Sequence, residues 1–149
     1  MTERRLHAYE VLLRMAQVRE IRASVALAKA ADEERARRTH RDEVRAARDA
    51  VSLASRGCVE NSSSVDMARY EMLAVLDASL TDRLEDASQQ HATTLQVREE
   101  SATASVLAKR YRERVDESVT DVGQALYRQR SAKRQDDAIE LWLESEKIK

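Results

Sequence analysis

The residues best suited to nucleophilic or metal chemistry in this 149-residue chain are one cysteine and three histidines. His7, His40 and His91 stand far apart, and none has a cysteine or a second histidine one helical turn away. A metal site needs several such ligands to converge, and Cys58 has no neighbouring histidine that could activate its thiol. We therefore expect no catalytic residue, no metal site and no cofactor, and we expect the imidazoles to be exposed or to flank a helix contact.

The carboxylates are numerous, but they lie among arginines in the pattern of ion pairs on a helix surface. The chain has 27 acidic and 26 basic residues and only two glycines, so it offers no glycine-rich loop for a phosphate. An enzyme also needs a concave site that excludes water, which a pair of long helices does not provide. We expect a protein that is not an enzyme.

Nucleic acid and membranes are poor matches for this composition. The most basic segment, residues 35–41, is closely flanked by five acidic residues, which would cancel most of the counterion release on a phosphate backbone. Aromatic residues for base stacking make up only 3% of the chain. No apolar run approaches the roughly 18 residues of a membrane span, and a single cysteine suits a reducing compartment. We expect a cytoplasmic protein with no nucleic-acid partner and no direct membrane insertion.

The elements that must position these residues are helices. The chain contains no proline and only Gly57 and Gly123 as glycines, and both residue types disfavour helix interiors. The only break in the helical pattern lies around residues 57–64, where Gly57 can end one helix and Ser64 can cap the next. The sequence predicts a single domain of about residues 3–56, a turn at 57–64 and a second helix of about 65–146. The fold class is all-α, with two long helices in an antiparallel coiled-coil hairpin and a C-terminal overhang.

Each predicted helix has one apolar stripe at coiled-coil spacing, and the two stripes are expected to pack together. The stripe of the first helix comprises Val11, Met15, Val18, Ile21, Val25, Ala28, Ala36, Val44, Ala47, Val51 and Ala54. The stripe of the second comprises Leu73, Leu76, Leu80, Leu84, Ala87, Leu95, Ala102, Val106, Tyr111, Val115, Val119, Val122 and Leu126. Both stripes weaken at residues 32–43 and 88–94, which predicts a flexible waist where these zones face each other.

The predicted helices differ in length, which leaves a tail. A turn centred at residue 61 places Tyr111 opposite Val11, so residues after about 122 have no partner in the first helix. This tail, residues 124–149, still holds apolar residues, which indicates that another molecule covers it. Its apolar residues are Leu126, Ile139, Leu141, Trp142 and Leu143.

Two segments are similar to parts of a known family. Residues 69–81 read RYEMLAVLDASLT, an aromatic followed by apolar residues at helical spacing and a threonine, and residues 128–138 read RQRSAKRQDDA, a basic run that turns acidic. With the hairpin layout, these segments resemble the type III secretion and flagellar export stalk proteins (FliJ/YscO-like). The resemblance covers most of the chain in architecture and about a fifth of it in motif.

The resemblance implies a non-enzymatic central stalk. In the family, the paired ends of the hairpin enter the pore of a hexameric export ATPase, and the start of the second helix contacts the export gate, a membrane protein. Secretion chaperones are a further partner class, and the place of action is the cytoplasmic face of the secretion apparatus. By this resemblance the ATPase-binding residues are Arg4, Arg5, Arg128, Arg130, Lys133, Arg134 and Trp142, and the gate-binding residues are Met72, Val75 and Leu76.

The gate assignment has two weaknesses in this sequence. Ser79 and Arg83 depart from the small apolar residue and the histidine of the family pattern, and Leu76 also belongs to the predicted stripe. On a helix, Met72 and Val75 lie about 100° to one side of that stripe, so we expect them to be exposed and Leu76 to be buried. Two alternatives stay open: a structural or scaffold coiled coil that bridges or dimerises partners, and a stalk of another rotary ATPase.

Overall fold

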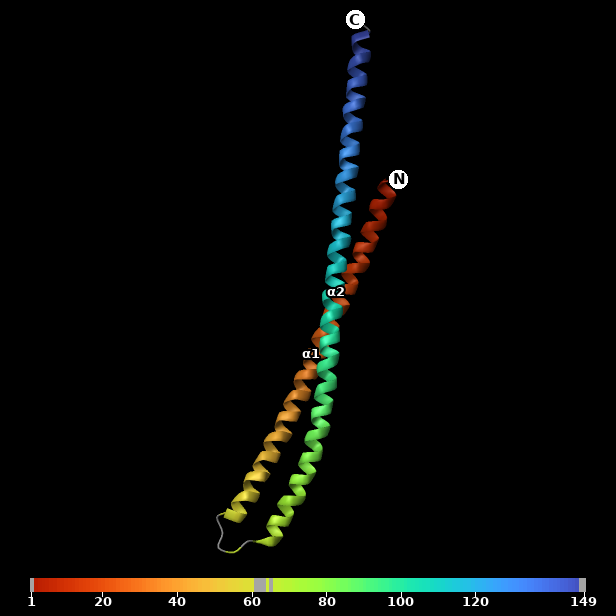
Figure 1. Ribbon diagram of the computed structural model, residues 1–149. Coiled ribbons are helices and arrows are strands. Elements are labelled where there is room, and N and C mark those ends of the chain that lie inside the picture. Colours follow the sequence, from red (N-terminus) through yellow and green to blue (C-terminus); the bar gives the residue numbers. More distant parts are fainter. Residues whose placement is uncertain (1, 61–63, 65, 148–149) are drawn as a thin grey trace. The chain divides into compact units, whose positions relative to one another are not determined.

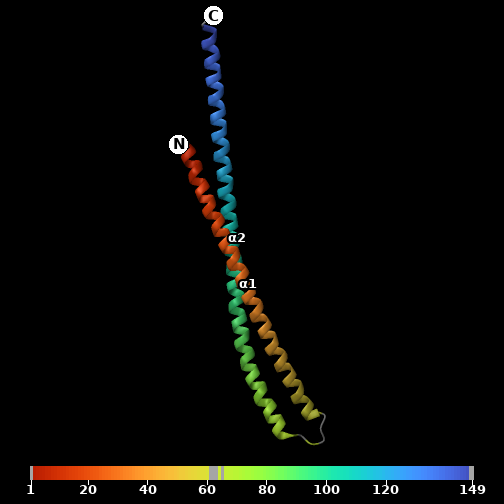
Figure 2. The same ribbon diagram turned by 180° about the vertical axis from the view of Figure 1, so that it is seen from behind.

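The structure is a computed structural model, and it describes residues 2–60, 64 and 66–147. Two α-helices account for nearly all of these residues: α1 (Thr2–Glu60) and α2 (Met67–Lys147). Figure 1 shows them as two uninterrupted helices that run in opposite directions, and Figure 2 shows the same helices from behind. No strand occurs in the described residues. The predicted all-α antiparallel hairpin is confirmed.

The helix ends differ from the predicted ones. Gly57 is helical and α1 continues to Glu60, and none of the described glycines has a positive φ angle. A single glycine costs a helix only about 1 kcal/mol, so Gly57 does not end α1 as predicted. The cap of α2 is Asp66 rather than Ser64, because Asp66 Oδ1 accepts a hydrogen bond from the Arg69 backbone N–H at 3.2 Å. Turn residues 61–63 and 65 lie outside the described residues.

The contacts of the chain fall into two compact units, and each contains part of both helices. Unit 1 comprises Met1–Ser24 and Ala104–Lys149, and unit 2 comprises Val25–Thr103. The predicted single domain stays a prediction.

In unit 2 the helices meet along residues that alternate in steps of three and four, as in a coiled coil. On α2 this row contains the buried Leu73 and Ala87 and the half-buried Leu80 and Leu84, all of which belong to the predicted stripe. Leu76, however, is 43% exposed, so its predicted burial is wrong. On α1 the row passes through Ala30, Glu34, Arg41, Val44, Arg48 and Val51.

In unit 1 the predicted stripe of α1 is not the one that faces α2. The least exposed residues there are Leu6, Tyr9, Leu13, Ala16, Glu20 and Ala23, with Ala16 only 1% exposed. The predicted stripe lies two residues further along, which is about 200° around the helix. Its members form an exposed row that we call the outer ridge of α1. The outer ridge of α1 comprises Val11, Met15, Val18 and Ile21, which are 42%, 51%, 46% and 63% exposed.

The α2 side of unit 1 follows the prediction more closely. Val115 and Leu126 are buried, and Val119 and Val122 are half-buried, as expected for the predicted stripe. Tyr111, by contrast, is 43% exposed. The side chain of the next residue, Arg112, points toward α1 instead. Its Nε donates a hydrogen bond to Glu20 Oε2 at 2.9 Å.

The overhang begins later than predicted. Tyr111 precedes the partner of Glu20 and does not lie opposite Val11. Arg130 forms an ion pair with Glu3, so α2 still has a partner in α1 eight residues beyond the predicted limit of 122. Every side chain from 132 to 147 is exposed, and the end of α2 extends past the start of α1 in both views (Figures 1 and 2). We call residues 132–147 the C-terminal extension.

Candidate interaction surfaces

The most buried charge among the described residues is Glu34, whose side chain is 4% exposed within unit 2. Its Oε1 lies 2.8 Å from Nε2 of His91, which joins α1 to α2. Arg98 Nη1 lies 3.4 Å from the other carboxylate oxygen, and Arg38 Nε lies 4.0 Å from Oε1. One carboxylate therefore holds an imidazole and two guanidinium groups where most coiled coils place aliphatic side chains.

A third arginine, Arg41, contacts the other ring nitrogen of His91. Arg41 Nη1 lies 3.0 Å from Nδ1 of His91, and a guanidinium can only donate. Nδ1 therefore accepts, and Nε2 carries the proton that it donates to Glu34. In this arrangement His91 bridges Arg41 and Glu34, an arginine and a carboxylate of the same helix, α1.

The carboxylate is stabilised in its charged form. The hydrogen bond from His91 lowers the pKa of Glu34 most, against the opposing effect of burial, and the charges of Arg38 and Arg98 add to it. Arg37 also donates to Gln90 at 2.8 Å, next to this cluster. The zones predicted to face each other, residues 32–43 and 88–94, do so, but they are joined by polar contacts. The flexible waist stays a prediction.

The positions of Glu20 and Glu34 on the face of α1 that packs against α2 were not predicted, because only apolar residues were assigned to that face. A signal was present: from Leu13 and Ala16, steps of four and three residues reach both glutamates through Ala23, Leu27 and Ala30. A stripe of small and apolar residues that includes a glutamate in strict register indicates a cross-helix pair.

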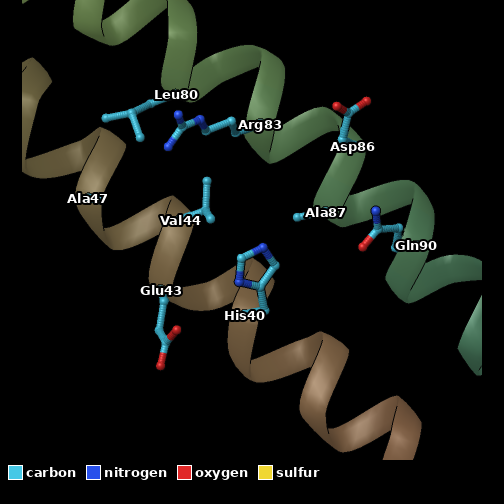
Figure 3. Close-up of a pocket in the computed structure, with 9 residues that line it drawn as sticks. All are labelled: His40, Glu43, Val44, Ala47, Leu80, Arg83, Asp86, Ala87 and Gln90. Atoms are coloured by element: carbon cyan, nitrogen blue, oxygen red, sulfur yellow. The ribbon is translucent and has the colours of Figure 1, made fainter.

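A groove of about 440 Å³ lies between the helices in unit 2. Val44 from α1 and Leu80 and Ala87 from α2 point into the space between the helices, whereas Glu43 and Asp86 point away (Figure 3). Alanines at 47 and 87 leave room that larger side chains would fill. His40, Arg83 and Gln90 edge the groove, but they belong to no arrangement of nucleophile and base. The groove can take an apolar side chain.

The proposed gate-binding residues lie together on one face of α2 in unit 2. Met72 and Val75 are 60% and 72% exposed, as predicted, and with Leu76 they form what we call the outer ridge of α2. These side chains line an open hollow of about 700 Å³ together with Ala68, Glu71 and Ser79. The hollow is apolar with a carboxylate at its edge, which suits a partner helix that has basic residues beside an apolar row.

The proposed ATPase-binding residues lie in unit 1 and are exposed. Arg130 of α2 forms an ion pair with Glu3 of α1, and this hydrogen bond lowers the pKa of Glu3. The structure thereby brings the arginines near the start of α1 and those near residue 130 of α2 to one end of unit 1. Arg5 also lines a groove of about 540 Å³ with Tyr9, Leu12 and Val122. The exposed members of this group are Arg4, Arg5, Arg128, Arg130, Lys133 and Arg134.

The C-terminal extension carries the remaining proposed contact. Trp142 is 61% exposed, and Ile139 and Leu143 are 56% and 47% exposed on the same side of the helix. An indole in water with apolar neighbours is an anchor typical of protein interfaces.

In the described residues there is no group of three histidine, cysteine or acidic side chains that could hold a metal ion. Neither α1 nor α2, over the residues described, contains a stretch apolar and long enough to cross a bilayer. No protein-family model, curated protein or solved structure matches the chain.

Proposed function

We propose that this protein is a non-enzymatic stalk component of a bacterial type III protein export apparatus. It inserts the end of unit 1, where both helices meet, into a hexameric export ATPase at the cytoplasmic face of the apparatus. It links that ATPase to the export gate through the outer ridge of α2 and takes part in handling secretion chaperones. The proposal rests on the resemblance of residues 69–81 and 128–138 to the export stalk family.

The observation that best supports the proposal is the position of the arginines. Arg4 and Arg5 from α1 and Arg128 and Arg130 from α2 gather at one end of unit 1, and the Glu3–Arg130 pair joins the two helices there. A group of exposed positive charges from both helices suits a ring with an acidic lining. The C-terminal extension adds Trp142 as an apolar anchor beyond this group.

The experiment is a binding assay with the purified hexameric export ATPase of the same organism. Truncation after Arg130 removes the C-terminal extension and keeps the buried Leu126 and the Glu3–Arg130 pair. We expect the truncated protein to lose ATPase binding while its helical content per residue, measured by circular dichroism, stays unchanged. Binding that survives the truncation would refute the assignment of this segment.

A matched pair of substitutions sharpens the test. Trp142→Ala removes the proposed anchor, whereas Leu141→Ala removes a similarly exposed residue on a different side of the helix. We expect Trp142→Ala alone to weaken ATPase binding, by at least about tenfold if the indole is buried in the complex. Equal effects of the two changes would show that the helix is not bound through the Trp142 side.

The gate contact is tested separately. Met72→Asp and Val75→Asp place a charge on exposed positions, so the fold should be kept and export should be lost. Arg69→Gln, next to the same ridge, is a control that leaves the apolar residues in place. If Met72→Asp has no effect on export, the outer ridge of α2 does not bind the gate.

The alternative function is a structural coiled coil that bridges or dimerises partners without a role in secretion. The exposed outer ridge of α1 favours it, because an apolar row on a helix that is already paired on its other side indicates a further helix. Normal binding of the ATPase would exclude this alternative as the whole function.

A further inference from the structure

Two exposed apolar ridges lie on the helices of this chain, each away from the face that packs against the other helix. The outer ridge of α1 lies in unit 1, and the outer ridge of α2 lies in unit 2. On α1, Val11, Met15 and Val18 follow the packed Tyr9, Leu13 and Ala16 by two positions, which places them on the opposite side of the helix. On α2, Met72 and Val75 lie to one side of the packed Leu73, and both are more than half exposed.

The two ridges are opposite in charge. Between residues 4 and 22, α1 has five arginines and two glutamates, and Glu20 of these is already bound to Arg112. Between residues 66 and 86 the chain has six acidic residues and only two arginines. Two copies of the same ridge would repel each other, whereas one ridge of each kind would attract.

The spacing of the ridges also agrees. Val11, Met15 and Val18 follow steps of four and three, and so do Ala68, Met72 and Val75. When the two helices are aligned in parallel with Met15 beside Met72, Val18 falls beside Val75. In a parallel coiled coil, a g position of one helix faces the following e position of its partner. In this alignment Glu71 occupies the g position and Arg19 the e position. Apolar layers and an ion pair thus occur in one register.

We propose that the outer ridge of α1 binds the outer ridge of α2 of a second copy of this chain. The two ridges are different surfaces, so the contact is heterologous, and each copy keeps one ridge of each kind for a further neighbour. The chain would therefore form open or ring-shaped assemblies as its concentration rises. This inference is independent of the proposed ATPase contact, because it uses neither the C-terminal extension nor the arginines near residue 130.

The test is sedimentation velocity of the full-length chain over a range of concentrations. Wild-type protein should associate, and raising the salt concentration should weaken the association by about tenfold, since an exposed charge contact is screened. Met15→Asp and Val75→Asp each remove one ridge at an exposed position, so each variant alone should be monomeric with unchanged helical content. Leu141→Asp, exposed but outside both ridges, should associate like the wild type.

Mixing the two variants gives the decisive result. Val75→Asp keeps its α1 ridge and Met15→Asp keeps its α2 ridge, so the mixture should form a one-to-one dimer and nothing larger. A monomeric wild type, association of either variant alone, or a mixture without dimer would each overturn the proposal.

A charge exchange tests the register. Arg19→Glu should weaken association, and Glu71→Arg introduced together with it should restore most of the loss, as a coupled pair does in a double-mutant cycle. If the double variant is as weak as the single variants, the parallel register is wrong. In the antiparallel alternative, Met15 lies beside Val75 and Val18 lies beside Met72. That arrangement predicts that Glu71→Arg does not restore the association lost in Arg19→Glu.

Discussion

In unit 1, the less hydrophobic face of α1 packs against α2, and the more hydrophobic face is exposed to water. The face that packs on α2 contains Ala16 and Glu20, whereas the face left in water contains Val11, Met15 and Val18. The small side chain of Ala16 lets the helices approach, and Glu20 meets Arg112 at 2.9 Å. The hydrogen bond with Glu20 raises the pKa of Arg112. Complementarity with the facing helix therefore selects the packed face.

The difference also indicates what each face is for. A face of small and polar residues with matched partners joins the two helices of this chain in one register. A face of larger aliphatic residues without a described partner is available to another molecule. Changes on the packed face should alter stability, and changes on the outer ridges should alter association.

The largest effect is expected from a charge on the packed face. Leu73 is 8% exposed, so Leu73→Asp should lower the free energy of unfolding by at least about 3 kcal/mol, because it buries a carboxylate without a partner. Leu76→Asp, on the exposed side of the same turn, should be tolerated. Thermal unfolding followed by circular dichroism measures both, and equal destabilisation by the two variants would contradict the assignment of faces.

A smaller effect is expected from adding volume. Ala16 is 1% exposed, so Ala16→Leu should push the helices of unit 1 apart and cost about 1–3 kcal/mol of stability. Val18→Ala, on the outer ridge, should change stability by no more than about 0.5 kcal/mol. Urea titration of both variants checks the contrast. A stabilised Ala16→Leu variant would place the packed face elsewhere.

The polar cluster of unit 2 should give a pH-dependent effect. The folded pKa of Glu34 lies below its ordinary value of 4.5, so its contribution is complete above that value and is lost as the pH falls through the lowered folded pKa. The melting temperature of the wild type should therefore exceed that of Glu34→Gln at neutral pH, and the difference should shrink in acid. Glu3 and Asp42, whose pKa values are also lowered, are present in both proteins and cancel in this comparison. A difference that grows in acid would show that the carboxylate is not stabilised in its charged form.

The smallest effect is expected at the end of unit 1. Glu3 and Arg130 are 70% and 58% exposed, and an ion pair in water contributes little. Glu3→Gln should leave the melting temperature unchanged within error. The melting temperature of the variant should depend on salt no more than that of the wild type. A clear loss of stability would mean that this pair closes the end of the hairpin more firmly than its exposure indicates.

Several features were fixed by local sequence. The absence of proline and the scarcity of glycine predicted two long helices, and the polar segment near residue 60 predicted one reversal of the chain. In unit 2 the burial of Leu73 and Ala87 and the half-burial of Leu80 and Leu84 on α2 were predicted correctly, but between Leu73 and Leu80 the packed row passes through Asp77 rather than Leu76. The exposure of Met72 and Val75 also followed from their position around the helix.

Other features were decided by tertiary contacts. In α1 two rows about 200° apart both follow coiled-coil spacing, and nothing within the helix decides which of them meets α2. Glu20 and Glu34 enter the packed face only because Arg112 and His91 stand opposite them, across separations of 92 and 57 residues. The same pairings shift the register and move the start of the overhang from about residue 122 to beyond Arg130. Helices form from local backbone preferences, whereas their pairing depends on side chains that only the folded chain brings together.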